Sequence, residues 1–244
     1  MEKSEPGRTP TGKPLELIVC DTDALTQIFC TKHETILKHL HTKFGIHFAV
    51  TEAVEAEMFR PKRRHAECCR DGFQKALDTR LIIVLSPRTL GQFTSINPFV
   101  TYDSMELLGQ KYHRILERGE AYSHAAAHVL KCAVLSNDWK AIRDSDRLGL
   151  VLEHPTLRVY DLVVFLFQCS ELTEKACDGF RKALHDLDEA PHSAFASRKF
   201  RDGLSSFYPR LVNPEIKILG SMVEIELGDQ HRVELMKPRG KSAG

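Results

Sequence analysis

The segment HVLKCAVLSNDWKAIRDSDRLG, residues 128–149, decides the fold class of this chain. Its apolar run AVL (133–135) predicts a short buried strand. SND (136–138) follows at once, and a charged segment with a helical pattern comes after it. A strand that passes directly into a helix is typical of α/β domains with a parallel sheet. Asp138 then either caps the helix or lies at the sheet edge where open α/β proteins bind ligands.

The same order of strand and helix recurs along the chain. Apolar runs predict strands at LELIVC (15–20), GIHFAV (45–50) and RLIIVLS (80–86), and GLVLE (149–153) predicts a fifth. Helices are expected over 22–44 in two pieces, over 51–59 with Thr51 as cap, over 60–80 after Pro61, over 103–117, and after Gly119; residues 87–99 are expected to form a loop. We therefore expect an α/β, three-layer fold with a mostly parallel central sheet flanked by helices.

The two ends of the chain depart from this pattern. Residues 1–14 are polar and proline-containing and predict a disordered leader before a domain at 15–158. Two amphipathic helices are expected at 159–169 and 173–187. Near the end, Val223, Ile225 and Leu227 alternate with glutamates before a Gly-Asp turn, which predicts a β-hairpin. Residues 159–244 are thus expected to form a helical and hairpin extension.

The composition argues against a strongly basic nucleic-acid-binding protein, a membrane-spanning protein and a secreted protein. The formal net charge is +1 over 244 residues, whereas proteins that cover nucleic-acid phosphates are usually strongly basic. No apolar run is long enough to span a bilayer, and no secretory signal is visible, so a cytoplasmic protein without a membrane partner is expected. The seven cysteines lack Cys-x-x-Cys spacing, which favours reduced thiols over disulfides or zinc.

Acidic residues occur where the predicted strands end and where helices begin. Asp21 and Asp23 follow the first strand, and Asp138 follows the strand at 133–135. Glu57 lies on the helix after the second strand, and Glu120 opens the Ala-rich helix before the strand at 133–135. Because parallel strands end at one edge, these carboxylates could gather there around a hard cation such as Mg²⁺.

These motifs resemble, in order, those of the PIN-domain nucleases, particularly the prokaryotic branch akin to toxin ribonucleases. The segments are IVCDTDAL (18–25), VTEAVEAEM (50–58), RGEAYSHAAA (118–127) and VLSNDWKAIRDSDRLGL (134–150), and the resemblance spans about residues 15–155. The resemblance implies a divalent-metal-dependent nuclease, most simply an endoribonuclease on single-stranded RNA, with DNA less favoured. It implies one or two Mg²⁺ or Mn²⁺ ions held by Asp21, Glu57, Glu120 and Asp138.

The resemblance leaves some assignments and partners open. Glu55 competes with Glu57 for the second acid, and the arginine that many relatives carry after Ala141 comes one place later, at Arg143. An inhibitory protein partner, as in toxin–antitoxin pairs, a scaffold partner and a homodimer all stay open.

Several further side chains are candidates for supporting roles. Ser136, Asn137, Asp23, Arg143 and His124 are candidates to orient the acids or the substrate. His124 and His128 share a helix face, but without the Glu of a zinc-protease motif, packing or surface histidines are favoured. A basic segment offers a clamp for a nucleic-acid backbone or a merely solvated helix face: Arg60, Lys62, Arg63, Arg64 and Arg70.

Two other functions are compatible with the same residues. The first is a non-catalytic PIN-like module that binds nucleic acid or a protein, with residues 159–244 as its interface. The second is an α/β phosphatase or phosphotransferase with Asp21 as nucleophile, because Asp-x-Asp after a strand also begins such sites.

Overall fold

The computed structural model describes residues 16–60, 66–137, 156–187 and 199–200. The predicted leader, the strand at 149–153 and the C-terminal hairpin lie outside these residues. So do five candidate site residues: Lys62, Arg63, Arg64, Asp138 and Arg143. The chain divides into two compact units, residues 1–159 and 160–244, which are described separately below.

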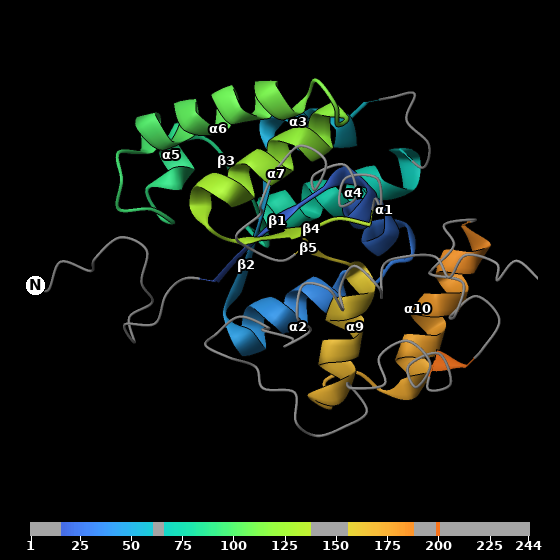
Figure 1. Ribbon diagram of the computed structural model, residues 1–244. Coiled ribbons are helices and arrows are strands. Elements are labelled where there is room, and N and C mark those ends of the chain that lie inside the picture. The colour runs from blue at the N-terminus through green and yellow to red at the C-terminus, as the bar shows by residue number, and fades with distance from the viewer. Residues whose placement is uncertain (1–15, 61–65, 138–155, 188–198, 201–244) are drawn as a thin grey trace, which may run out of the picture. The chain divides into compact units, whose positions relative to one another are not determined.

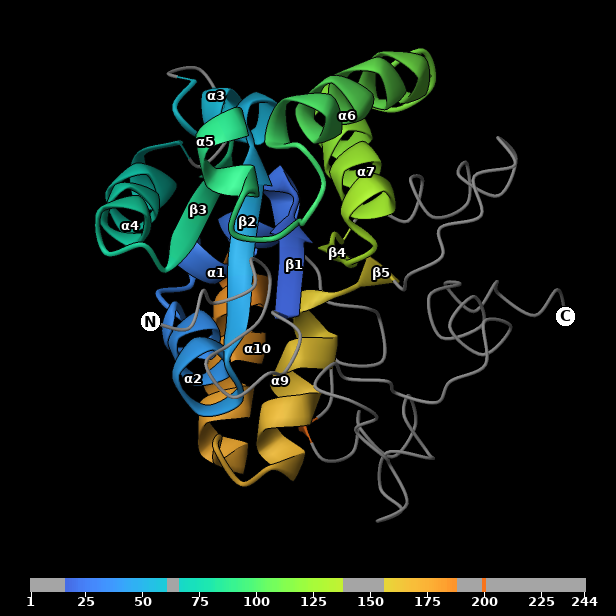
Figure 2. The same ribbon diagram turned by 90° about the vertical axis from the view of Figure 1, so that its left-hand side faces the viewer.

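The first unit contains a parallel sheet of five strands (Figure 2). The strands are β1 Glu16–Cys20, β2 Ile46–Thr51, β3 Ile82–Leu85, β4 Ala133–Leu135 and β5 Thr156–Leu157, in the spatial order β3-β2-β1-β4-β5. Every neighbouring pair is parallel. Val19 of β1 pairs with Ala49 on one side and with Val134 on the other. The expected α/β class with a parallel sheet is confirmed.

Helices cover the sheet on both faces (Figure 1). In chain order they are α1 Thr22–Cys30, α2 Thr35–Phe44, α3 Glu52–Met58, α4 Ala66–Asp78, α5 Pro87–Leu90, α6 Pro98–Tyr112 and α7 Arg118–Leu130. In Figure 1, α7 lies above the sheet and α2 below it. The expected break within 22–44 is confirmed, and Thr51 caps α3 by accepting a hydrogen bond from the Val54 N–H.

The prediction of a loop over 87–99 holds for residues 91–97 and is wrong at both ends of that range. Pro87 opens the short helix α5, and Pro98 opens α6. Proline is well suited to a first helical turn, where its missing N–H would have no partner in any case. Side chains complete both starts, because Thr89 Oγ1 accepts from the Ser86 N–H and Asn97 Oδ1 accepts from the Phe99 N–H.

The core explains why the strands read as continuous apolar runs. Val19, Ala49 and Val134 are almost completely buried, since helices cover both faces of the sheet. On the α7 side, Ala126 and Ala127 pack against these strands with Leu85 and Met105. The small alanine side chains let α7 lie close to the sheet. This packing positions the first turn of α7, which contains Glu120.

The second unit has two helices, α9 Val159–Gln168 and α10 Glu174–Asp186, and so confirms the expected pair. Thr173 caps α10 through the Ala176 N–H. Within the unit, the Tyr160 and Phe180 rings lie 5.6 Å apart, and Phe167 packs on Phe200 at 5.2 Å. Among the described helices, none has the length and apolar character needed to cross a bilayer.

Candidate functional site

The strand order creates a switch point between β1 and β4. From β1 the chain adds β2 and β3 on one side and then returns to place β4 on the other side. Open α/β sheets bind ligands in the crevice at the carboxyl end of such a switch point. Asp21 directly follows β1 and Ser136 directly follows β4, and the Asp21 N–H donates to the Leu135 carbonyl at 2.8 Å. The predicted first acid therefore lies at this switch point.

Asp21 is a buried carboxyl group with two hydrogen-bond donors. Only 4% of its surface is exposed. Its Oδ1 accepts from the Thr22 N–H at 2.7 Å, and its Oδ2 accepts from the Ser136 hydroxyl at 3.0 Å. Burial, together with the charges of Asp23 and Glu57, raises the pKa of Asp21 to about 7, although both hydrogen bonds oppose this rise. Asp21 thus has a strong tendency to keep a proton unless a cation comes close.

Glu57 joins three elements at the same edge. From α3, its Oε2 accepts from the Thr22 hydroxyl of α1 at 2.8 Å. Its Oε1 accepts from the Gly119 N–H of α7 at 3.0 Å. A Cβ built on Gly119 would lie 2.5 Å from Oε2 of Glu57, so glycine is required for this close approach.

Glu120 follows Gly119 in the first turn of α7 and is 6% exposed. The hydrogen bonds of Glu57 therefore connect the hydroxyl of the residue after Asp21 with the backbone N–H of the residue before Glu120. Glu55, the alternative second acid, is half-buried elsewhere on α3, and burial and the charge of Glu52 raise its pKa. The contacts described here involve Glu57 and not Glu55.

The acids that the structure describes do not form a compact group of metal ligands. Within the described ranges, the group of three or more potential ligand atoms that all lie within 4.8 Å of one another consists of cysteines only. The carboxylate oxygens of Asp21, Glu57 and Glu120 therefore do not all lie within 4.8 Å of one another. Asp138, the fourth predicted acid, lies outside the described residues.

Asn137 has a positioning role in the structure. Its Nδ2 donates to Gln27 Oε1 at 2.9 Å, and its Oδ1 accepts from the Val159 N–H at 3.3 Å. These bonds tie the end of β4 to α1 and to Val159, the last residue of the first unit. Ser136 thus links the end of β4 to the residue that follows β1, and Asn137 links it to α1. Asp23 is exposed on the first turn of α1.

Sequence reasoning missed three residues at this edge. Thr22 and Gly119 hold Glu57, and Gln27 holds Asn137. Thr22 stands inside the Asp-Thr-Asp motif and Gly119 directly precedes Glu120, so their positions in the motifs offered a weak signal. Gln27 offered none, because its partner is far away in the chain.

His124 is fully buried within α7. His128 is exposed, so the two rings occupy different environments. Burial lowers the pKa of His124 to about 4, and neither ring nitrogen has a hydrogen-bond partner among the described residues. His124 is therefore neutral near pH 7.

The structure describes two residues of the predicted basic segment, Arg60 and Arg70, and both are exposed.

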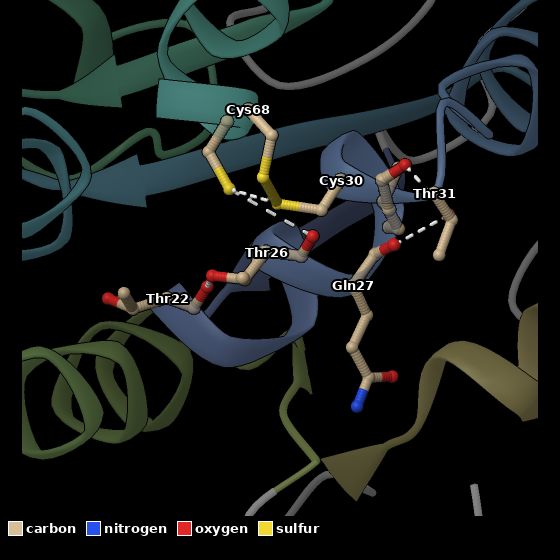
Figure 3. The surroundings of a disulfide bond; sticks show 8 residues. Thr22, Thr26, Gln27, Cys30, Thr31 and Cys68 are labelled. Atoms are coloured by element: carbon tan, nitrogen blue, oxygen red, sulfur yellow. Dashed lines mark hydrogen bonds between the residues drawn. A yellow bond between two sulfur atoms is a disulfide. The ribbon is translucent and has the colours of Figure 1, made fainter. Parts of the chain in front are cut away.

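The prediction that all cysteines are reduced is wrong for two of them. Cys30 and Cys68 form a disulfide that joins the end of α1 to the first turn of α4 (Figure 3). Their Cα atoms are 5.1 Å apart, within the ordinary range for such a bond. No pattern in the sequence indicates this bond, because it depends on the packing of α1 against α4.

A pocket on the other side of α1 contains none of the candidate acids. Residues of α1, α2 and α4 line it, including Phe29, Glu34, Lys38 and Lys75. It offers apolar surface with a mixed charged rim, and no predicted site residue contributes to it.

No family model, curated protein or solved structure matches this chain. The similarity to PIN domains therefore stays a prediction from the motifs.

Proposed function

We propose that this protein is a divalent-metal-dependent nuclease with a PIN-like fold that cleaves single-stranded RNA. The observation that carries the proposal is the double hydrogen bond of Glu57. By accepting from Thr22 and Gly119, Glu57 brings together the chain segments that contain Asp21 and Glu120. These segments meet at the carboxyl end of the sheet beside the β1–β4 switch point, where ligands bind in this class of fold.

The chemistry of these side chains fits Mg²⁺ or Mn²⁺. Both are hard cations that prefer carboxylate oxygens and retain several waters. Asp21 is buried close to the charges of Asp23 and Glu57, and an additional positive charge would favour its ionised form. We assign Asp21, Glu57, Glu120 and Asp138 as the acids that would hold the ion.

Each described residue has a part in this assignment. Ser136 donates to Oδ2 of Asp21 and fixes the direction of the carboxylate. Thr22 and Gly119 hold both oxygens of Glu57, so Glu57 helps to place the acids of α1 and α7. When bound, the ion would supply a water that ionises near neutral pH and would neutralise the charge that develops on the phosphate. The exposed Arg60 and Arg70 would contact the RNA backbone.

The test is cleavage of a generic single-stranded RNA by the purified protein with Mn²⁺ or Mg²⁺. We expect cleavage that stops on addition of EDTA and falls by about a hundredfold or more in Asp21→Asn or Asp138→Asn, because each removes an acidic ligand. Asp186→Asn, at the end of α10, is the matched control and should cleave normally.

Other outcomes would separate the alternatives. Cleavage that survives both substitutions would refute the assignment of the acids. Salt-sensitive RNA binding without cleavage would favour a binding module. Turnover of a small phosphate ester through an aspartyl phosphate on Asp21 would favour a phosphatase.

A further inference from the structure

Three cysteine side chains gather where the end of α1 meets the first turn of α4. Cys30 is the last residue of α1, and Cys68 and Cys69 follow the first residues of α4. The three sulfur atoms all lie within 4.8 Å of one another. Sγ of Cys69 is 2.9 Å from Sγ of Cys30 and faces the Thr26 carbonyl at 4.0 Å. Cys69 therefore points at the Cys30–Cys68 pair.

Once the disulfide is reduced, the three thiols are close enough to move apart around one thiophilic metal ion. With Zn–S bonds of about 2.3 Å, thiolates around a tetrahedral zinc lie roughly 3.8 Å apart. We propose that, in the reduced protein, Cys30, Cys68 and Cys69 form a three-thiolate site for Zn²⁺, with water as the fourth ligand. Hard cations such as Mg²⁺ prefer oxygen, so this site and the acidic edge select different metals.

The surroundings of the three thiols agree with this role. Cys69 is buried, Cys30 is half-buried and Cys68 is exposed, so the cluster has an inner wall and an open side for the ion and its water. The first turn of α4 also offers the positive end of a helix dipole to thiolates. By contrast, burial raises the pKa of Cys132 and of Cys177 to about 12, so those thiols stay protonated.

The disulfide is the metal-free, oxidised form of the same cluster. In that form two of the three sulfurs are bonded to each other and cannot bind an ion. A small dithiol reductant supplies two electrons and two protons, the Cys30–Cys68 bond breaks, and the reductant becomes a disulfide. Zn²⁺ then displaces the thiol protons to solvent as it binds.

The test uses the full-length protein, reduced with a dithiol and then freed of it under argon. Titration with Co²⁺ should give thiolate-to-cobalt charge-transfer absorption that saturates at one ion per chain, and Zn²⁺ should abolish it. Cys30→Ser, Cys68→Ser and Cys69→Ser should each weaken this absorption and lose stoichiometric binding. Cys169→Ser, half-buried in the second unit, is the matched control and should bind as the wild type does.

Two results would overturn the proposal. One is reduced wild-type protein that shows no charge-transfer absorption with Co²⁺. The other is unchanged absorption in Cys68→Ser, whose exposed side chain can be replaced without disturbing the fold.

Alkylation followed by mass spectrometry gives an independent reading. Bound Zn²⁺ should protect Cys30 and Cys68, the two accessible members of the cluster, from iodoacetamide. Equal labelling of these two with and without Zn²⁺ would also refute the site. The zinc site does not depend on nuclease activity, so failure of one proposal leaves the other standing.

Discussion

Gly119 leaves no room for a side chain beside Glu57. Alanine normally favours a helix over glycine by about 1 kcal/mol. Here its Cβ would lie 2.5 Å from Oε2 of Glu57 and 3.0 Å from Oγ1 of Thr22. We expect Gly119→Ala to displace Glu57 and to lower the RNA cleavage proposed above by about tenfold to a hundredfold, because small misplacements of groups in an active site are costly. Steady-state kinetics with Mn²⁺ measures this.

Gly179 provides the control for this substitution. It lies within α10, and a Cβ built there meets no atom within 4 Å. Gly179→Ala should therefore leave cleavage unchanged and stabilise the protein by about 0.5–1 kcal/mol. Equal activity of the two variants would show that Glu57 does not depend on Gly119.

Asp21 should make the stability of the metal-free protein depend on pH. Its pKa rises to about 7 in the folded state, so the folded state holds this proton more tightly than the unfolded state. The resulting stability is complete below the unfolded pKa near 4 and is lost as pH rises through 7. Asp21→Asn keeps an acceptor for the Thr22 N–H and cannot ionise, so it should unfold at higher temperature than the wild type at pH 8.

The difference in the free energy of unfolding between Asp21→Asn and the wild type should shrink towards pH 4, because the wild-type carboxyl is then protonated. From the size of the pKa change, it should approach at most about 4 kcal/mol at pH 8. Thermal melts in EDTA across pH 4–8 measure it. If the melting temperatures of the two proteins changed with pH in parallel, Asp21 would have an ordinary pKa. When Mn²⁺ is added at pH 8, it should stabilise only the wild type.

The positions of the acids in the fold could be predicted from the sequence, but the residues that form hydrogen bonds around them could not. Asp21 and Glu120 could be predicted because each follows a strand end or opens a helix. Thr22, Gly119 and Gln27 act through contacts between elements, and a single sequence does not state which elements meet. The same limit hid the disulfide, whose two cysteines are 38 residues apart.

At the scale of elements, the contact of α6 with α7 depends on another glycine. A Cβ built on Gly109 of α6 would lie 2.8 Å from the Tyr122 ring of α7. Because overpacking costs about 1–3 kcal/mol and the helix gains less than that from alanine, Gly109→Ala should destabilise the protein by about 1 kcal/mol. Urea denaturation measures this, and a stabilisation equal to that of Gly179→Ala would contradict the close contact.

Element types were easier to predict than element boundaries. Continuous apolar runs such as those of β1 and β2 have one simple explanation, a strand buried on both faces. Residues 87–99 contain Pro and Gly and were assigned to a loop, although proline also opens helices. Only the capping contacts of Ser86 and Asn97 distinguish these two cases.

At the scale of the whole molecule, the Cys30–Cys68 bond should contribute to stability by restricting the unfolded chain. Closing a loop across 38 residues is worth about 3–4 kcal/mol in the chain-entropy view. We expect reduction in the absence of metal to lower the free energy of unfolding by about that amount. Urea denaturation with and without a dithiol measures it, and Cys68→Ser should be insensitive to the reductant.

The fold class followed from the alternation of strands and helices, but the strand order did not. Nothing in the apolar runs states that β4 lies beside β1 rather than beside β3. That placement creates the switch point, and it results from how α5, α6 and α7 carry the chain back across the sheet. The site's position in the fold is therefore a property of the assembled unit.

The hydrogen bond from Ser136 to Asp21 spans 115 residues of the chain. A ribosome that has made only the first 130 residues has produced the segments of β1, β2, β3 and all the helices through α7. It has not yet produced β4 or Ser136, which bond to the backbone and the carboxyl group of Asp21. The surroundings of the Asp21 carboxyl are therefore completed only after β4 and Ser136 have left the exit tunnel.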